Sequence, residues 1–234
     1  MIKAAVVILN YNGASLLQKF LPSVIANTPS WCSVIVADNA STDNSLSLLQ
    51  QHFPDVQCIE MQQNTGFAGG YNNALHQIDA EYFILLNSDI EVTPQWVEPI
   101  IEFMIQHADV AACQPKILAY NQKDFFEHAG ACGGYIDYLG FPFCRGRIFN
   151  SLEKDENQYP DNKEIFWATG AAMFIRSNVF KATGGFDADF FAHMEEIDLC
   201  WRMKHCGYKL YCIPASKVYH VGGGTLHKSN PKKT

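Results

Sequence analysis

The feature that most constrains the fold is a set of four short apolar runs in the first 90 residues, which alternate with segments that have the spacing or the cap residues of a helix. The runs are AAVVIL, SVIVAD, VQCIEM and YFILL, at residues 4–9, 33–38, 56–61 and 82–86. After the first run, apolar residues recur three and four positions apart through residues 15–27, which predicts a helix. Strands that alternate with helices predict a parallel sheet with right-handed crossovers. We therefore expect an α/β fold, with a mostly parallel central sheet flanked by helices.

The alternation becomes less regular beyond residue 94. Residues 119–164 are rich in glycine, aromatic and charged residues, which indicates hairpins and loops packed against the sheet. The other predicted elements are a helix opened by Ser41-Thr42-Asp43, helices around 71–78, 94–107 and 194–206, and strands at 110–118 and 208–214. No internal repeat or linker interrupts the chain. We expect one domain, residues 1–225, followed by a short, flexible basic tail, residues 226–234.

Charge and length limit the class of protein. A chain of 234 residues with 48% hydrophobic residues is long enough for a full core and ordinary in composition. Its net charge of −7 argues against nucleic acid as a partner, because such binding needs Lys and Arg to neutralise phosphates. The tail holds an obvious basic cluster, Lys228, Lys232 and Lys233, which a solvated terminus explains better than a lipid-facing anchor.

The eight cysteines are scattered, without a C-x-x-C pair or the spacing of a zinc site. They are expected to be reduced thiols, as in cytosolic proteins. The apolar run at residues 4–9 is too short for a signal peptide, and no stretch approaches the roughly 18 apolar residues of a membrane span. These features predict a cytoplasmic location.

Polar residues and glycine follow each of the four predicted strands. The stretches are Asn10-Tyr11-Asn12, Asp38-Asn39, Asn64-Thr65-Gly66 and Asn87-Ser88-Asp89. Ligands of parallel α/β sheets bind just outside the carboxyl ends of the strands, so all four stretches are expected at one binding edge. Turn chemistry alone explains any one of them, because Asn, Asp and Gly dominate turns. Their repetition at one edge favours a binding site.

The glycine-rich stretch NTGFAGGYN, residues 64–72, opens a predicted helix whose free backbone N–H groups suit phosphate oxygens. The chain lacks a G-x-G-x-x-G fingerprint after its first strand and has no Walker sequence, which argues against dinucleotide and P-loop sites. A mononucleotide site remains, with the Asp38 carboxylate as acceptor for a ribose or a base edge. The candidate nucleotide-binding residues are Asn10, Asn12, Asp38, Asn64, Gly66, Gly69, Asn72 and Ser88.

Asp89 follows a strongly apolar strand, and a carboxylate fixed in this way can hold a hard divalent cation shared with a diphosphate. Asn87 could add a carbonyl oxygen. His220 lies between an apolar run and a triple glycine, which makes it a further candidate ligand, although a lone histidine is more often structural. The candidate metal ligands are therefore Asp89, His220 and Asn87, for Mn²⁺ or Mg²⁺. A mixture of oxygen and nitrogen ligands favours Mn²⁺.

Two adjacent glutamates, Glu195 and Glu196, lie at the start of the predicted helix at 194–206. Consecutive helical residues point about 100° apart, so the two are not expected to address one point. Glu195 shares a face with Asp198 and Arg202, whose spacing predicts an i,i+4 ion pair. Glu196 shares the more apolar face, where desolvation raises the pKa of a carboxyl group and favours a general base. The candidate catalytic residues are Glu196 and, since an error of one residue in the helix start would exchange them, Glu195.

Taken together, these stretches resemble the family 2-type glycosyltransferases of the GT-A fold, close to bacterial rhamnosyltransferase-like enzymes. The resemblance runs from residue 3 to about residue 225 and is carried, in order, by VVILNYNG, VIVADNASTDNS, NTGFAGGYN, LLNSD, ATGAAMFIR, GGFDADFF, EEIDLCWR and YHVGGG. It implies a GT-A, or nucleotide-diphospho-sugar transferase, fold. It also implies that Asp38 binds the nucleoside, that Asn87-Ser88-Asp89 replaces the D-x-D metal motif, that Glu196 is the catalytic base and that His220 completes the metal site.

The resemblance implies an inverting glycosyltransferase that moves a hexosyl or deoxyhexosyl group from a UDP- or dTDP-linked donor to an acceptor hydroxyl. The acceptor is expected to be a glycan or lipid-linked saccharide in cell-surface polysaccharide synthesis, with peripheral contact at the inner face of the membrane. A non-enzymatic sugar-nucleotide or glycan-binding module is the alternative. A sugar-phosphate nucleotidyltransferase is disfavoured, because it would need a basic glycine-rich loop after the first strand, and NYNGAS has no positive charge.

Overall fold

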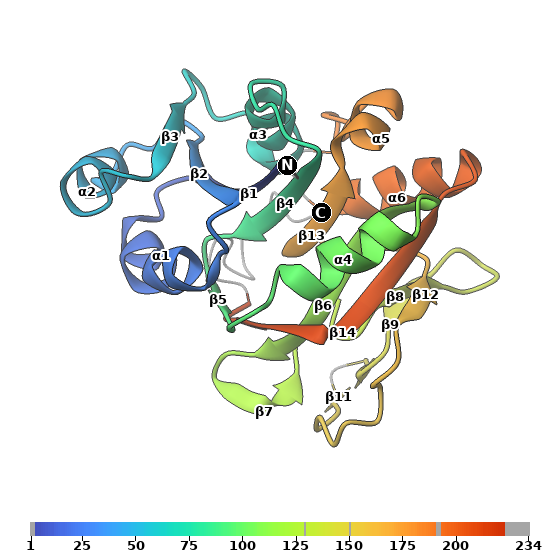
Figure 1. Cartoon of the computed structure of the whole chain (residues 1–234). Helices are drawn as coiled ribbons and strands as arrows, with labels where there is room; N and C mark the ends of the chain where they lie inside the picture. The colour runs from blue at the N-terminus through green and yellow to red at the C-terminus, as the bar shows by residue number, and fades with distance from the viewer. Residues whose placement is uncertain (1–2, 129, 150, 191–192, 223–234) are drawn as a thin grey trace.

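A ten-stranded sheet runs through the molecule and carries helices on both faces (Figure 1). The structure is a computed structural model that describes residues 3–128, 130–149, 151–190 and 193–222. The strands of this sheet are β1 (Ala4–Asn10), β2 (Cys32–Asp38), β3 (Gln57–Glu60), β4 (Tyr82–Asn87), β5 (Ile90–Val92), β6 (Val110–Ala119), β7 (Gln122–Phe126), β12 (Lys163–Ile165), β13 (Ala172–Arg176) and β14 (Lys209–His220). The helices are α1 (Ala14–Asn27), α2 (Ser45–His52), α3 (Gly66–Leu75), α4 (Glu98–Gln106), α5 (Ser177–Ala182) and α6 (Glu195–His205).

The four strands predicted in the first 90 residues form the parallel half of the sheet, in the order β4-β1-β2-β3. Side chains of β1 alternate between two apolar layers. Val6 and Ile8 pack with α1, α2 and α4, whereas Ala5 and Val7 pack with α3, α5 and α6. Because helices cover both faces, β1 and β4 are apolar almost throughout, whereas the edge strand β3 keeps Gln57 and Glu60 exposed. The expected α/β fold, with a central sheet flanked by helices, is confirmed.

The other half of the sheet is mixed. β13 runs antiparallel to both of its neighbours, β4 and β6, whereas β14 runs parallel to β6. β14 is longer than the predicted strand, because it continues through a register shift between Ile213 and Lys217 and ends at His220. β5 pairs antiparallel with the last residues of β14. This pairing places the end of β14 beside the segment that follows β4.

Two helices begin later than their sequence signals predict. α2 begins at Ser45, because the Asp43 carboxylate accepts the backbone N–H of Ser45 and holds the preceding turn outside the helix. α4 begins at Glu98, since Gln95 has a φ of 59°, which a right-handed helix does not allow. α5 is too short to show helical spacing, and the sequence does not predict it.

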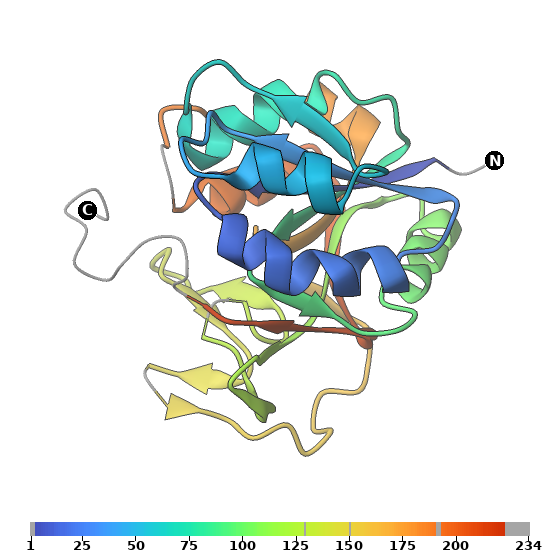
Figure 2. The ribbon, with the colours of Figure 1, turned by 90° about the vertical axis from the view of Figure 1, so that its left-hand side faces the viewer.

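Residues 119–164 form the short strands and loops that their composition predicts. They include two hairpins outside the main sheet, β8 (Gly134–Ile136) with β9 (Pro142–Cys144), and β10 (Arg147–Ile148) with β11 (Ser151–Leu152). The loop after them is anchored by a buried ion pair, in which Lys116 Nζ lies 2.9 Å from Asp155 Oδ1. In Figure 2 both hairpins (yellow) extend toward the side on which β14 (red) ends.

Within the described ranges, no helix is long and apolar enough to cross a membrane. None of the eight cysteines, all of which lie in these ranges, forms a disulfide. The basic tail at residues 226–234 lies outside the described residues, and the domain boundary at residue 225 stays a prediction.

Candidate active site

The loops that follow β1 and β2 are joined by buried polar side chains. Asn10 and Asp38 end the two paired strands, and Asn10 Nδ2 donates to Asp38 Oδ2 at 2.9 Å. The other oxygen, Asp38 Oδ1, accepts the backbone N–H of Ser41 at 2.8 Å. The Asp38 carboxylate is therefore fixed at the binding edge by its own loop. Its contact with a nucleoside stays a prediction.

Asn12 connects the same two loops. Its Oδ1 accepts the backbone N–H groups of Thr42, at 2.7 Å, and Asp43, at 3.2 Å. This geometry needs a φ of 51°, which Asn tolerates better than most residues. Gly13 is equally constrained, because a Cβ there would lie 2.3 Å from Asn10 Oδ1. The residues predicted after β1 and β2 are thus brought together at one edge.

The glycine-rich turn before α3 lies against the loop after β2. Asn64 Oδ1 accepts the N–H of Gly66 at 2.9 Å and the Nδ2 of Asn39 at 3.0 Å. Gly66 has a φ of 74°, and a Cβ at Gly69 would lie 2.8 Å from the Cβ of Thr65. The predicted helix N-terminus at this edge is confirmed, and phosphate binding there stays a prediction.

Asn72 is partly buried and Ser88 is buried. Asn72 Nδ2 donates to the Phe186 carbonyl at 2.7 Å, and Asn72 Oδ1 accepts the Phe186 N–H at 3.0 Å. Asn72 therefore supports the loop before α6, with both ends of its amide in use. Ser88 is buried, and its Oγ lies near Gly13.

Asp89, His220 and Glu127 form a buried row at the end of β14. The N–H of Val221 donates to the Asp89 carbonyl at 3.1 Å, next to the pairing of β5 with β14. His220 Nε2 consequently lies 3.1 Å from Asp89 Oδ1, and its Nδ1 lies 3.6 Å from Glu127 Oε2. Burial alone would lower the pKa of His220, but the two carboxylates overcome this effect and raise the pKa to about 10.

Asp89 has the surroundings of a metal ligand. It is 1% exposed, and neither carboxylate oxygen accepts a hydrogen bond of good geometry from the described residues. Enclosed carboxylate oxygens beside an imidazole suit a divalent cation such as Mn²⁺, which would replace the proton that the imidazole holds at its raised pKa. Across the described part of the chain, no three carboxylate, imidazole or thiol groups form a closed metal site. A cation here would therefore take further ligands from a substrate and from water.

Glu127 has no clear signal in the sequence. It follows β7, whose residues QKDFF do not have the pattern of a buried strand. The weak hint is an acid directly after two aromatic residues, in FFEHAG. Gly222 has a φ of 72°, and a Cβ there would lie 2.8 Å from Glu127 Oε1. The backbone therefore passes close to Glu127 at Gly222, the member of the glycine run that the structure describes.

Glu195 and Glu196 begin α6 with interacting carboxyl groups. Glu195 is 4% exposed and Glu196 is half-buried, and Oε2 of each lacks a hydrogen-bond partner among the described residues. Burial and the charge of Glu196 raise the pKa of Glu195 to about 8, and burial also raises the pKa of Glu196. A hydrogen bond between the two groups favours a proton on Glu195 and a negative charge on Glu196.

The expectation that the two glutamates address different points is therefore wrong. Their Cβ atoms diverge on the helix, but each side chain has three rotatable bonds and the carboxyl groups can still meet. The chain also enters α6 through His193 and Met194, whose φ values are 75° and 72°. Helical spacing alone does not describe the first residues after such a turn.

The ion pair predicted on α6 is confirmed. Arg202 Nη2 lies 2.6 Å from Asp198 Oδ2, and both side chains are partly exposed. The same guanidinium donates to the Gly185 carbonyl at 2.8 Å. Asp198 and Arg202 therefore support the loop before the helix.

Gly170 brings α6 close to the end of β4. A Cβ on Gly170 would lie 3.9 Å from the Cβ of Glu196, an ordinary contact distance, so the two backbones are neighbours here. The next residue, Ala171, accepts the backbone N–H of Asn87 at 2.9 Å. Asn87 is partly exposed, and it connects this contact to Asp89 two residues later. The carboxyl pair and the Asp89–His220 pair thus belong to one region of the molecule.

A buried carboxylate–imidazole pair and two interacting carboxyl groups lie near the carboxyl ends of parallel strands. Such groups are suited to an enzyme that transfers a chemical group. Residues 5–184 match the Glycosyl transferase family 2. The chain belongs to this family and is a glycosyltransferase, so the resemblance inferred from its motifs is confirmed.

The curated relatives include two proteins named as rhamnosyltransferases. The N-acetylglucosaminyl-diphospho-decaprenol L-rhamnosyltransferase of Mycobacterium tuberculosis (strain H37Rv) is 26% identical over 233 residues, which cover 92% of this chain and 75% of that protein. The rhamnosyltransferase WbbL of Escherichia coli (strain K12) is 24% identical, over 92% of this chain and 82% of that protein. The O-antigen biosynthesis protein RfbC of Myxococcus xanthus is 26% identical, over 93% of this chain and 17% of that protein.

Solved structures share the fold. GalNAc-T7 with UDP, GalNAc and Mn²⁺ has a TM-score of 0.75 and 17% identity, over 94% of this chain and 44% of that chain. The mannosyltransferase PcManGT from Pyrobaculum calidifontis with GDP-Man and Mn²⁺ has a TM-score of 0.64 and 15% identity, over 93% of this chain and 56% of that chain. The chain spans about half the length of these structures, and the GT-A fold is confirmed.

Proposed function

We propose that the protein is an inverting glycosyltransferase that moves a sugar from a UDP- or dTDP-linked donor to a hydroxyl group of a glycan or lipid-linked saccharide. The observation that carries the proposal is that two acidic pairs, Asp89 with His220 and Glu196 with Glu195, are linked by the contacts at Gly170, Ala171 and Asn87 described above. The first pair suits the donor diphosphate, and the second suits the proton of the acceptor. The name of the M. tuberculosis relative includes a decaprenol-linked diphosphate, which supports a lipid-linked acceptor. The acceptor would then belong to cell-surface polysaccharide synthesis at the inner face of the membrane.

The donor nucleoside would contact the loops after β1 and β2. Asp38 would accept a hydrogen bond from the ribose or the base, and its fixed position at the edge supports this role. The first turn of α3, which begins at Gly66, would offer backbone N–H groups to the phosphates. Asn10, Asn12 and Asn64 would hold these loops in place.

Asp89 and His220 would hold a divalent cation, with Asn87 as a further candidate ligand. Both solved neighbours named above contain Mn²⁺, and the enclosed oxygens of Asp89 support the same ion here. When bound, such a cation neutralises negative charge on a leaving nucleoside diphosphate.

Glu196 would take the proton from the acceptor hydroxyl as that oxygen attacks the anomeric carbon from the face opposite the leaving group. A single displacement of this kind inverts the configuration. Glu195, which keeps its proton near neutral pH, donates a hydrogen bond to Glu196 and thereby favours the charged form of the base.

The test combines a panel of UDP- and dTDP-linked sugars with Mn²⁺ and a soluble analogue of a lipid-linked saccharide. NMR of the product reports the anomeric configuration. A product with the configuration opposite to that of the donor supports the proposal. Retained configuration would contradict it, as would the absence of transfer from a donor that binds.

A further inference from the structure

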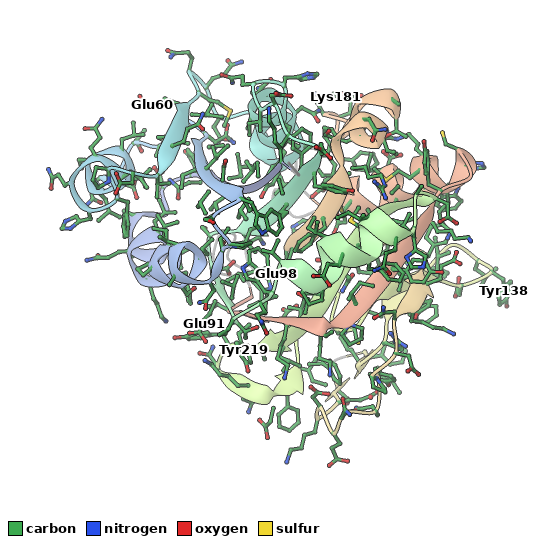
Figure 3. The ribbon with its side chains drawn as sticks, viewed as in Figure 1. Glu60, Glu91, Glu98, Tyr138, Lys181 and Tyr219 are labelled. Carbon is green, nitrogen blue, oxygen red and sulfur yellow. The ribbon has the colours of Figure 1, made fainter. Side chains whose placement is uncertain are left out.

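The turn of the β8–β9 hairpin exposes four large apolar side chains. Tyr138 is 93% exposed, Leu139 64%, Phe141 65% and Phe143 49%. Figure 3 shows Tyr138 at the periphery, pointing away from the molecule. Residues 137–143 are called the hairpin tip below. Large apolar side chains gathered on one exposed element mark an interaction surface.

The hairpin tip is held in shape by its own hydrogen bonds. Asp137 Oδ1 accepts the N–H groups of Leu139, at 2.8 Å, and Phe141, at 2.9 Å. The Asp137 N–H in turn donates to the Phe141 carbonyl at 3.0 Å, and Gly140 closes the turn with a φ of 90°. The one acidic group of the tip is therefore occupied by its own backbone, and the apolar side chains are held outward.

Both ends of the hairpin are tied to the candidate active site. The Gly134 N–H donates to the Trp167 carbonyl at 3.2 Å. The next residue, Ala168, contacts Cys200 of α6. At the other end, Cys144 Sγ lies 3.8 Å from the His128 carbonyl, one residue from Glu127. The tip itself extends away from the end of β14, since Tyr138 and Tyr219 lie on opposite sides of Figure 3. The base of the hairpin is therefore connected to the site, whereas its tip is free to contact another surface.

The charge around the tip differs from that of the whole chain. Residues 130–152 contain one acid, Asp137, and two bases, Arg145 and Arg147, whereas the chain carries a net charge of −7. At a lipid–water interface, aromatic rings lie at the level of the headgroups and bases meet anionic lipids. A protruding turn of Tyr, Leu and Phe with two arginines behind it matches that environment, whereas a protein partner would need a hollow to receive it.

We propose that the hairpin tip inserts into an anionic lipid surface and seats the enzyme there. This inference deepens the proposed function and rests on it, because a lipid-linked acceptor presents its sugar at such a surface. Insertion of the tip would hold the enzyme at the surface that presents this acceptor.

The test is flotation of the full chain with vesicles of phosphatidylcholine and phosphatidylglycerol, compared with vesicles of phosphatidylcholine alone. The wild-type protein should float with the mixed vesicles. The triple variant Tyr138→Ser, Leu139→Ser, Phe141→Ser should bind at least about tenfold more weakly, because three large apolar side chains leave the interface. The matched control, Ile25→Ser with Ile105→Ser, changes side chains of α1 and α4 that are 42% and 48% exposed and should float like the wild type.

Nucleoside diphosphate affinity of the same preparations, measured by calorimetry, should be equal in all three and shows that the variants are folded. Equal flotation of the triple variant and the wild type, or no flotation of the wild type, would overturn the inference. A dimer seen by light scattering and lost in the triple variant, without flotation, would assign the tip to a second copy of the chain. Protein that floats as expected but transfers no sugar would contradict the proposed function alone.

Discussion

His220 Nε2 lies 3.1 Å from Asp89 Oδ1, because the end of β14 pairs with β5 directly after Asp89. The contact joins two residues 131 positions apart in the chain that the sequence suggests for different reasons. Asp89 follows an apolar strand, and His220 precedes a glycine run. Glu127 lies on the other side of the imidazole, 3.6 Å from Nδ1. This row can be tested by cation binding, without a measurement of turnover.

Replacement of either candidate ligand should weaken cation binding. We expect Asp89→Asn and His220→Gln each to lower the Mn²⁺ affinity, with UDP or dTDP present, by at least about tenfold, because each removes one of two protein ligands. Electron paramagnetic resonance of free Mn²⁺ measures this affinity. Asp124→Asn, a surface acid paired with Lys154, is the matched control. Wild-type affinity in both ligand variants would remove the cation from the mechanism.

Glu127→Gln should weaken Mn²⁺ binding by about tenfold, because Glu127 orients the imidazole from its far side. The same variant should lower the pKa of His220, followed by NMR without metal, since one of the two carboxylates that raise it is lost. Glu91→Gln, on β5 but paired with Lys123 at the surface, is the control. If neither the Mn²⁺ affinity nor the pKa of His220 changes, Glu127 does not orient the imidazole and only packs against it.

Asp38→Ala should weaken UDP or dTDP binding by about 1 to 3 kcal/mol, the cost of losing a hydrogen bond to a charged group. The structure adds a second effect, since Asp38 also accepts hydrogen bonds from Asn10 and Ser41 and its loss should reduce stability. Ser41→Gly keeps the backbone N–H that Asp38 accepts and removes the hydroxyl bonded to Asn10, so it serves as the loop control. Calorimetric titration measures the nucleotide affinity of the folded Asp38 variant. An affinity equal to that of the wild type would mean that Asp38 only holds the two loops together.

The raised pKa of Glu195 predicts a stability that falls as the pH rises. Its carboxyl pKa moves from 4.5 to about 8 on folding, so between these values the folded state keeps a proton that the unfolded state has lost. The stabilisation is fully present at pH values below the unfolded pKa and is lost as the pH rises through the folded pKa. Relative to Glu195→Gln, the wild type should lose unfolding free energy between about pH 5 and pH 8. Urea unfolding measures this difference, and a difference independent of pH would contradict the raised pKa.

The parallel half of the fold was predictable because β1, β2 and β4 are largely buried on both faces and α1 shows helical spacing. β1 and α1 agree with the predicted residues to within one position at each end. β5 and the last residues of β14 are different. Their pairing joins residues 90–92 to residues 218–220, and such a contact depends on the whole sheet rather than on a local pattern.

The site was predictable where a polar break follows an apolar run, as it does at Asp38 and Asp89. Glu127 was missed because the strand before it is mostly polar. The contact between Glu195 and Glu196 was missed because it depends on side-chain rotamers, which helical spacing does not specify.

The claim that Glu196 accepts the acceptor proton is tested most directly by single-turnover transfer at saturating donor. We predict that Glu196→Gln lowers transfer by about 10² to 10⁴ with donor affinity nearly unchanged, because the amide keeps the shape of the side chain but takes no proton. Asp198→Asn, which loses only a partly exposed ion pair, should transfer at close to the wild-type rate in its folded fraction. A slow Glu195→Gln beside an active Glu196→Gln would move the base by one residue, and wild-type rates in all three variants would contradict the general-base assignment.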